Sequence, residues 1–309
     1  MPEYRVPKVQ IVPQPDEKVS FQVDGQEKLA WNFPKSSPRP FLFPVLGPSG
    51  RPLTRMGHPA APNHDHHRSI WIGHRSIGDL NFWEERGGAQ QIRQEQWIHY
   101  QDGEDEAGMA IRLGWFDGHN AKVLGQDLTL VYRPLPENEG WFEIQSTFTT
   151  SLPRLAIGQT NFGFFGLRVA ASLSAHFGNG RLTDDQHRTG ERAIFSQQAR
   201  WMDYSGPIVG TREEGITWFD HPENPNYPSS WHVRDDGWMS AASNFRAGSI
   251  LRRGQTLRLR YGFYVHTGVA NHNTNETKRR MFEQAGAWEL ARAERPWRYH
   301  LRRRTTKRN

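Results

Sequence analysis

Apolar and polar residues alternate with a period of two along much of the chain, which is the pattern of strands that bury one face. The clearest case is residues 255–266, whose apolar face contains Leu257, Leu259, Tyr261, Phe263 and Val265. Residues 141–150 repeat the pattern with Phe142 and Ile144. We therefore expect an inward-facing set that consists of Phe142, Ile144, Leu257, Leu259, Phe263 and Val265.

Turn-forming stretches such as "GPSGRP", "ENEG" and "PENPNYP" separate these runs. Because a twisted sheet of many long strands curls or splits, the pattern predicts an all-β fold, a large two-layer antiparallel β-sandwich. Residues 275–292 instead have a helical apolar stripe, formed by Met281, Phe282, Ala285 and Trp288. We expect one peripheral C-terminal helix there.

No internal repeat or shift in composition marks a domain boundary. We expect a single sandwich domain over residues 1–286 and a basic C-terminal extension over residues 287–309. The net charge is +6, and residues 295–309 contain seven Arg and Lys and no acidic residue. This segment is compatible with a solvated tail or with an arm that binds a polyanion. Because the excess charge is terminal, we expect no nucleic-acid partner.

Composition excludes several kinds of site. The 309-residue chain contains no cysteine, which rules out disulfides, zinc–thiolate and iron–sulfur sites, and cysteine nucleophiles. Its 12 Trp, 17 Phe and 8 Tyr supply large apolar areas although hydrophobic residues make up only 36%. With no leader and no apolar run long enough to cross a bilayer, the sequence predicts a soluble, cytoplasmic protein without a membrane partner.

The stretch "NHDHHRSIWIGH", residues 63–74, contains four histidines and an aspartate. His64 and His66 have the two-residue spacing at which an extended chain can chelate one ion, with His74 or Glu84 as a third ligand. The aspartate between the two histidines departs from the usual iron triad. A polar loop without function and a ligand pocket are the alternatives. We favour the pocket, in which Arg68 assists the imidazoles, and we predict no bound metal.

A second polar cluster is "FDHPENPNYPSSWHVRDDGWM", residues 219–239. Its prolines stiffen an irregular loop that carries Asp220, His221, His232 and Arg234. Trp231 and Trp238 either return to the core or form a stacking platform for a ligand. Imidazole and guanidinium groups beside an indole suit a sugar, whose hydroxyls need hydrogen bonds and whose C–H face packs on aromatic rings.

A third candidate is Arg168 in "NFGFFGLRVA". Alternation places it on the same strand face as Phe162, Phe164 and Gly166. Arg168 is then either a charge directed into a cleft or a surface residue at a strand end.

Five blocks together resemble the PmoA-like family of bacterial proteins: "HDHHRSIWIGH", "FGLRVA", "RWMDYSGP", "FDHPENPNYPSSWHVRDDG" and "LRLRYGFYVHTG". The resemblance extends from about residue 18 to about residue 270. It implies a large sandwich similar to galactose mutarotases and other sugar-acting proteins. Members are often labelled methane oxygenase, a label we reject because that membrane subunit needs several transmembrane helices. The basic extension after residue 286 is not part of the family pattern.

We favour an enzyme that acts on a sugar or sugar derivative by isomerisation, hydrolysis or elimination, without a cofactor. His67 and His232 are the expected acid and base, because imidazoles titrate near neutrality. Glu84, Asp79 and Asp220 remain candidates for the second role. The alternatives are a non-catalytic carbohydrate-binding module and a His-ligated, metal-dependent oxygenase.

The expected partner is a small sugar or glycoside, and a homo-oligomer remains open. The side chains expected to bind substrate are His64, His66, Arg68, Trp71, His74, Arg168, His221, Trp231 and Arg234. Arg68 and Arg234 would hold a hydroxyl or a carboxylate. We expect residues 64–74 and 219–238 to converge on one cleft, with Trp231 or Trp71 as its apolar wall.

Overall fold

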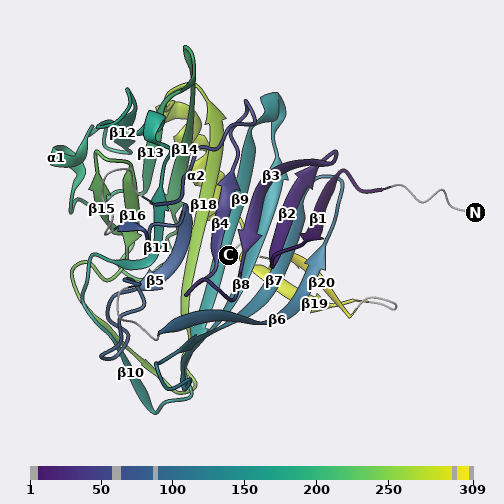
Figure 1. Ribbon diagram of the computed structural model, residues 1–309, viewed down its shortest axis with the longest axis vertical. Helices are drawn as coiled ribbons and strands as arrows, with labels where there is room; N and C mark the ends of the chain where they lie inside the picture. The colour runs from purple at the N-terminus through teal and green to yellow at the C-terminus, as the bar shows by residue number, and fades with distance from the viewer. Residues whose placement is uncertain (1–5, 58–63, 86–89, 294–297, 306–309) are drawn as a thin grey trace, which may run out of the picture.

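The computed structural model describes residues 6–57, 64–85, 90–293 and 298–305. Two eight-stranded antiparallel sheets pack face to face as a β-sandwich, and in Figure 1 the N-terminal strands overlie the long strands of the second sheet. The expected all-β, two-layer fold is therefore confirmed. None of the helices in the described ranges combines the length and the apolar character needed to span a bilayer.

The first sheet has the order β1-β2-β3-β4-β5-β11-β16-β15. Its strands are β1 (Val9–Gln14), β2 (Lys18–Val23), β3 (Gln26–Asn32), β4 (Phe41–Val45), β5 (Ile70–His74), β11 (Gly163–Arg168), β16 (Trp238–Ala242) and β15 (Ser230–Arg234). The second sheet has the order β12-β13-β14-β18-β9-β8-β7-β6. Its strands are β12 (Arg181–Asp184), β13 (Trp201–Val209), β14 (Arg212–Asp220), β18 (Leu257–Thr267), β9 (Gly140–Thr149), β8 (Lys122–Pro134), β7 (Ala107–Phe116) and β6 (Gln91–Gln101).

Both sheets turn one apolar face into a shared core. Phe142 stacks on Phe263 with ring centroids 4.6 Å apart. Between the sheets, Phe165 of the first contacts Tyr261 of the second with ring centroids 5.6 Å apart. In the expected inward set, Leu257 is partly buried and all the others are buried in the core. Burial of one large apolar side chain contributes about 1.5–3 kcal/mol, so the alternation in the sequence drives the two sheets together.

Strand β18 differs from the half-buried strand that its pattern predicts. Arg260, Tyr264 and His266 on its outer face are also buried. They lie beneath the C-terminal segment, and Arg260 Nη2 donates to the carbonyl of Ala285 at 2.9 Å. Alternation reports which residues face the core, but it does not report what covers the other face.

The single C-terminal helix, α2 (His272–Gln284), is confirmed, with different bounds. It begins three residues earlier than expected because the Asn271 side chain accepts a hydrogen bond from the Thr274 amide at 3.0 Å and caps the helix. It also ends earlier, so Trp288 lies in a strand rather than on the helical stripe. Gly286 follows the helix at a point where a Cβ would lie 2.0 Å from the carbonyl oxygen of Arg304.

Part of the basic extension is folded. Strands β19 (Trp288–Arg292) and β20 (Tyr299–Arg303) form an antiparallel hairpin, and Trp288 and Leu301 pack on Val131 of β8. Residues 294–297 and 306–309 of this extension lie outside the described residues. The remaining elements are the pair β10 (Arg154–Ile157) and β17 (Ser249–Arg252), the short helix α1 (Glu191–Ile194) and the 3-10 helices η2 (Pro136–Asn138) and η3 (Ala171–Leu173).

Candidate functional site

The polar residues of β15 and β16 lie on the outer face of the first sheet, away from the second sheet. In β15, Trp231 and Val233 enter the core between the sheets, so His232 and Arg234 face outward by alternation. Trp231 is fully buried, and its Nε1 donates to the carbonyl of Ala199 at 2.8 Å. The expectation that Trp231 forms a cleft wall is therefore wrong, because its strand parity directs it inward.

Strand pairing places three outward residues side by side. Arg168 of β11 is opposite Trp238 of β16, and Trp238 is opposite Arg234 of β15. Gly166 provides the space for the indole, since a Cβ there would lie 2.5 Å from Trp238 and 2.8 Å from Trp71. The absence of a side chain at Gly166 thus allows two tryptophans to lie across the sheet.

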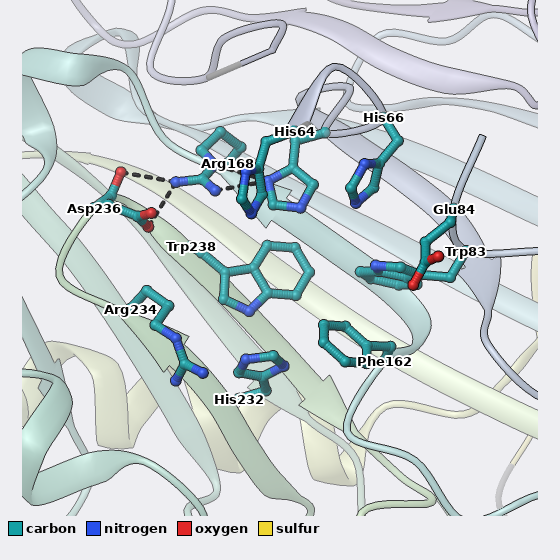
Figure 2. A pocket seen from close by; sticks show the side chains of 11 residues that line it. His64, His66, Trp83, Glu84, Phe162, Arg168, His232, Arg234, Asp236 and Trp238 are labelled. Atoms are coloured by element: carbon teal, nitrogen blue, oxygen red, sulfur yellow. Dashed lines mark hydrogen bonds and ion pairs between the residues drawn. The ribbon is translucent and has the colours of Figure 1, made fainter. Parts of the chain in front are cut away.

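A cavity of about 530 Å³ opens over this row (Figure 2). It is lined by His64, His66, His67, Trp83, Glu84, Phe162, Arg168, His232, Arg234, Asp236 and Trp238. Residues 64–67 and 232–238 therefore converge, although about 165 positions separate them along the chain. The cavity is large enough for a monosaccharide or a small glycoside.

Aromatic rings form the apolar part of the lining. Figure 2 shows Trp238 between the His64–Arg168 side and the His232–Arg234 side of the cavity. Its ring centroid is 5.4 Å from that of Trp83, which in turn is 5.5 Å from Phe162. Trp71 is buried beneath Trp238 at 5.0 Å and does not line the cavity. Trp238, Trp83 and Phe162 thus hold the position that was expected of Trp231 or Trp71.

His67 is held by the buried Arg168, which pairs with the partly exposed Asp236. Arg168 Nη1 donates to Asp236 Oδ1 at 2.6 Å, and Arg168 Nε and Nη2 donate to His67 Nδ1 at 3.1 and 2.6 Å. A guanidinium only donates, so Nδ1 of His67 is the acceptor and a neutral His67 carries its proton on Nε2. Burial lowers the pKa of Arg168, and Asp236 opposes that shift. The imidazole plane is further stacked on Trp71 and Trp238, at 4.8 and 5.1 Å.

His232 has the opposite tautomer. Its Nδ1 lies 3.0 Å from the carbonyl oxygen of Asn161, which only accepts, so Nδ1 carries the proton and Nε2 has the lone pair. Burial, followed by the positive charge of Arg234, lowers the pKa of His232 to about 4. At neutral pH His232 is therefore an uncharged imidazole and a proton acceptor.

Arg234 and Glu84 are more exposed than the Arg168–Asp236 pair. Arg234 lies over the Phe195 ring at 4.6 Å and 3.4 Å from Glu191. Glu84 lies 3.5 Å from Arg75. Both contacts are at the surface, where such pairs contribute about 0–1 kcal/mol, so these two charges remain able to turn toward a ligand.

His64 and His66 stand beside His67, with ring centroids 4.9 and 4.4 Å from it. Among the described residues, no group of three or more His, Asp or Glu side chains is arranged to hold a metal ion. His74, the third ligand considered with them, lies on the inner side of β5 in contact with Phe164 at 4.7 Å. The three imidazoles of residues 64–67 all line the cavity.

Two other residues of the first histidine cluster lie away from the cavity. Arg68 pairs with Glu85 through contacts of 2.7 and 2.8 Å. His74 is fully buried, its Nδ1 accepts from the Ser76 amide at 3.1 Å, and burial lowers its pKa to about 4. Neither Arg68 nor His74 lines the cavity, since the first is held by a carboxylate and the second faces the core side.

Asp220 and His221 are also placed elsewhere. Asp220 accepts from the amide of Ser229 and from Asn224 Nδ2, both at 2.7 Å, and burial raises its pKa to about 6. His221 contacts Phe282 of α2 with ring centroids 4.8 Å apart. These residues hold the proline-rich loop against the second sheet, because a buried carboxyl needs several donors. They do not line the cavity.

Four lining residues were absent from the expected site: Trp83, Phe162, Asp236 and Trp238. The shared face of Phe162 and Arg168 was a signal for Phe162, and Trp238 had been weighed as a platform. Phe164, expected on that same face, is instead in the core between the sheets. Nothing in the local pattern pointed to Asp236, because its role depends on a hydrogen bond to a distant strand.

A family model matches residues 18–279 under the description "Family of unknown function (DUF6807)". The chain belongs to this family. The match replaces the resemblance to the PmoA-like family, which was wrong as a family assignment. No curated protein matches the chain.

Two solved structures are similar to this chain at low scores. A GalM/aldose epimerase homologue from C. elegans is 8% identical, with 85% of this chain and 99% of that chain covered and a TM-score of 0.33. The structure of HI1317 is 10% identical, with 84% and 99% covered and a TM-score of 0.25. At these scores the function has to be argued from the cavity itself.

Proposed function

We propose that the protein binds a carbohydrate in the cavity over β11, β15 and β16 and moves a proton on it. The observation that carries this proposal is the pair of imidazoles near Trp238 that are held in opposite tautomers. His67 is 5.1 Å and His232 5.6 Å from the Trp238 ring. A proton acceptor and a hydrogen-bond donor are thus brought to one cavity.

The lining suits a sugar in both its apolar and its polar parts. Trp238, Trp83 and Phe162 offer aromatic surface to the C–H face of a pyranose. Glu84 and Arg234 supply an acceptor and donors for hydroxyl groups at the rim. The mixture of aromatic walls and a few convergent polar groups is typical of small-molecule sites rather than of a solvated loop.

In the proposed reaction, His232 Nε2 takes a proton from an O–H or C–H group of the sugar and returns it at another atom. His67 remains neutral and donates from Nε2 to the sugar oxygen that gains negative charge. A neutral imidazole acts in this way when its other nitrogen is engaged, because losing its only proton would be very costly. Arg168, backed by Asp236, keeps His67 Nδ1 as an acceptor and so acts as a positioning residue.

Proton nuclear magnetic resonance in D₂O tests this proposal with a panel of monosaccharides and simple glycosides. Isomerisation and elimination through a C–H group incorporate solvent deuterium, anomer exchange broadens or transfers the anomeric signals, and hydrolysis produces new reducing-end signals. We expect one of these changes for the wild type and a loss of about 10²–10⁴-fold in His232→Gln, the usual contribution of a general base.

The control is His119→Gln, because His119 is exposed in a turn between β7 and β8 and does not line the cavity. It should leave the rate unchanged. Binding that survives in His232→Gln without any turnover in the wild type would support the second candidate, a sugar-binding module without catalysis. No binding of any sugar by the wild type would overturn the carbohydrate proposal.

A further inference from the structure

Arg234, at the cavity rim, has hydrogen-bond donors that no protein acceptor among the described residues uses. Arg234 uses Nη1 for the carbonyl of Val233 at 3.0 Å and for the contact with Glu191 at 3.4 Å. Within the described part of the chain, its Nε and Nη2 donate no hydrogen bond, and its side chain is 39% exposed. Arg168, by contrast, has donors committed to Asp236 and His67. Arg234 is therefore the lining guanidinium that a ligand can engage.

Behind the lining, two arginines share one carboxylate in each of two places. In the first of these places, Arg68 is 2.7 Å and Arg39 is 3.6 Å from Glu85. Glu85 follows the lining residues Trp83 and Glu84 in the sequence. Burial lowers the pKa of Arg39 to about 10, and Arg39 Nη1 has no acceptor among the described residues.

In the second place, Asp236 forms an ion pair with Arg168, and its negative charge also attracts the guanidinium of Arg55. Burial, followed by the charge of Arg168, lowers the pKa of Arg55 to about 10. Arg55 Nη2 is buried and has no acceptor within the described ranges. Arg39 and Arg55 do not line the cavity themselves, but each contacts a lining residue: Arg39 Nη2 donates to the Trp83 carbonyl at 2.6 Å, and the charge of Arg55 interacts with Arg168 and Asp236. Buried positive charge directly behind the lining favours an anionic ligand.

We propose that the sugar bound in the cavity carries a carboxylate group, as uronic and aldonic acids do, and that Arg234 receives this carboxylate. This inference rests on the proposed carbohydrate function and names the class of ligand within it. A planar guanidinium with free Nε and Nη2 presents two parallel donors, which match the two oxygens of one carboxylate. The aromatic side of the cavity, at Trp83 and Phe162, would then contact the ring of the sugar.

The same contact would prepare His232 for proton transfer. The charge of Arg234 contributes to the low pKa of His232, after burial. A carboxylate on Arg234 offsets part of that charge and raises the pKa of His232 toward neutrality, where a proton acceptor is most effective. A neutral sugar would leave His232 a weak base. Binding of the acidic group and activation of the base are therefore coupled.

A carboxylate is favoured over a phosphate at this position. A phosphate group carries close to two negative charges and three acceptor oxygens, and sites that hold one usually combine several cationic or backbone N–H donors. Arg234 is a single guanidinium at a half-exposed rim, and Glu191 stands 3.4 Å from it. A monoanion matches this arrangement.

Isothermal titration calorimetry with paired sugars tests the inference. The pairs are glucuronate with glucose and galacturonate with galactose, which share a ring and differ in the carboxylate, and glucose 6-phosphate is the phosphate probe. We expect at least one uronate to bind about tenfold or more tightly than its neutral partner, with an affinity that falls as salt rises. Arg234→Gln should abolish that preference, and Arg234→Lys should keep part of it.

The matched control is Arg252→Gln, since Arg252 is exposed on β17 and does not line the cavity. Its affinities should equal those of the wild type. As a second readout, the His232 ring-proton titration should move to higher pH with the uronate, and this shift should be absent in Arg234→Gln.

The possible failures are distinguishable. Equal affinity for a neutral sugar and its uronate, or a uronate preference that Arg234→Gln leaves intact, overturns the carboxylate inference and leaves the carbohydrate function standing. Tighter binding of glucose 6-phosphate that depends on Arg234 replaces the carboxylate by a phosphate. If neither neutral nor acidic sugars bind to the wild type, the proposed function itself is overturned.

Discussion

The outer faces of the two sheets both contain networks of histidine and charged side chains, but one network borders a cavity and the other lies beneath a helix. On the first sheet, His67 and Arg168 with Asp236 border the cavity. On the second sheet, Asp203 accepts from His266 Nε2 at 2.8 Å and from Thr217 Oγ1 at 2.6 Å, beneath α2. We call these two regions the cavity face and the helix-covered face.

The difference lies in what covers each face. On the helix-covered face, Asn275 of α2 reaches Thr217 at 3.3 Å, and both residues are buried. On the cavity face, the short helix α1 reaches the rim, where Glu191 lies 3.4 Å from Arg234, and the polar groups border a volume of about 530 Å³. A histidine in a buried polar network is therefore structural where a helix covers it, and a candidate for chemistry where it lines an open cavity.

The two faces also differ in the charge state of their imidazoles. Burial opposes protonation of His266, yet Asp203 raises its pKa above the ordinary value. His232, which is buried beside Arg234, has its pKa lowered to about 4. The same residue type thus favours the charged form under α2 and the neutral form at the cavity.

Breaking the network of the helix-covered face should give the largest loss of stability. Asp203→Ala leaves the buried His266 without its carboxylate partner, and removal of one partner from a buried pair costs about 3–5 kcal/mol. Urea unfolding followed by tryptophan fluorescence measures the change in the free energy of unfolding. Asp127→Ala is the control, because Asp127 forms an exposed ion pair with Arg112 and should cost less than about 1 kcal/mol. An Asp203→Ala effect as small as that of the control would contradict the structural role of the network on the helix-covered face.

Acid should destabilise the protein by about 3 kcal/mol or more between pH 6.5 and pH 4. His74, His221 and His232 have pKa values near 4 in the folded state and near 6.5 when unfolded. The unfolded chain binds more protons in this window, so the free energy of unfolding falls as pH falls. Asp220, with its pKa raised to about 6, offsets part of this trend.

Single substitutions separate the two faces in that titration. His232→Gln should reduce the loss of stability below pH 6.5. His266→Gln should instead flatten the region above pH 6.5, because a raised folded pKa stabilises at low pH and the contribution is lost as pH rises through it. Denaturant unfolding at a series of pH values measures both slopes. Identical profiles for the two variants would remove the electrostatic distinction between the faces.

Filling the space above Gly166 should cost about 1–3 kcal/mol, as overpacking does. Gly166→Ala places a methyl group 2.5 Å from the outer edge of the Trp238 ring, so the indole must shift toward the cavity. Tryptophan fluorescence and sugar binding should both change. Adding Trp238→Phe removes the contacting ring atoms, and the double variant should lose less stability than the two single losses together. Strict additivity would show that the two residues do not share this space.

Glu84→Gln should have the smallest effect on stability, below about 1 kcal/mol. Glu84 is partly exposed, and its ion pair with Arg75 has a separation of 3.5 Å. If Glu84 accepts hydrogen bonds from sugar hydroxyls, the affinity for a bound sugar should fall while the unfolding midpoint stays constant. Arg75→Gln tests whether a loss of sugar affinity comes from breaking the Glu84–Arg75 ion pair. Equal losses of affinity in both variants would assign the effect to that ion pair.

The fold was predictable because strand faces follow from a local period. The parity of Phe142, Leu259 and Phe263 placed them in the core without knowledge of their neighbours. The same parity separates Trp231 from His232 in adjacent positions of β15. Trp231 lies next to a lining residue in the sequence, but alternation along β15 directs it into the core.

The site was predictable only in part. A shared pocket was indicated by the closely spaced histidines of residues 64–67 and by the two-residue spacing of His232 and Arg234. The structure places both segments at one cavity. His74, Asp220 and His221 had the same chemical signal and lie elsewhere. A polar side chain near a chemistry-rich motif is equally suited to hold a loop, and only its packing separates the two uses.

By itself, the amino-acid sequence determined the two-layer antiparallel sandwich, the inward side chains and the two segments that meet, because periodicity and residue type are local properties. The tertiary structure alone decided in which direction the pKa of each imidazole shifts, which arginines keep open donors, and that Gly166 makes room for Trp238. These properties depend on the groups brought within a few ångströms by strand pairing between β11, β16 and β15. Tautomers, pKa values and cavity shape respond to such distances steeply, and no short stretch of sequence contains them.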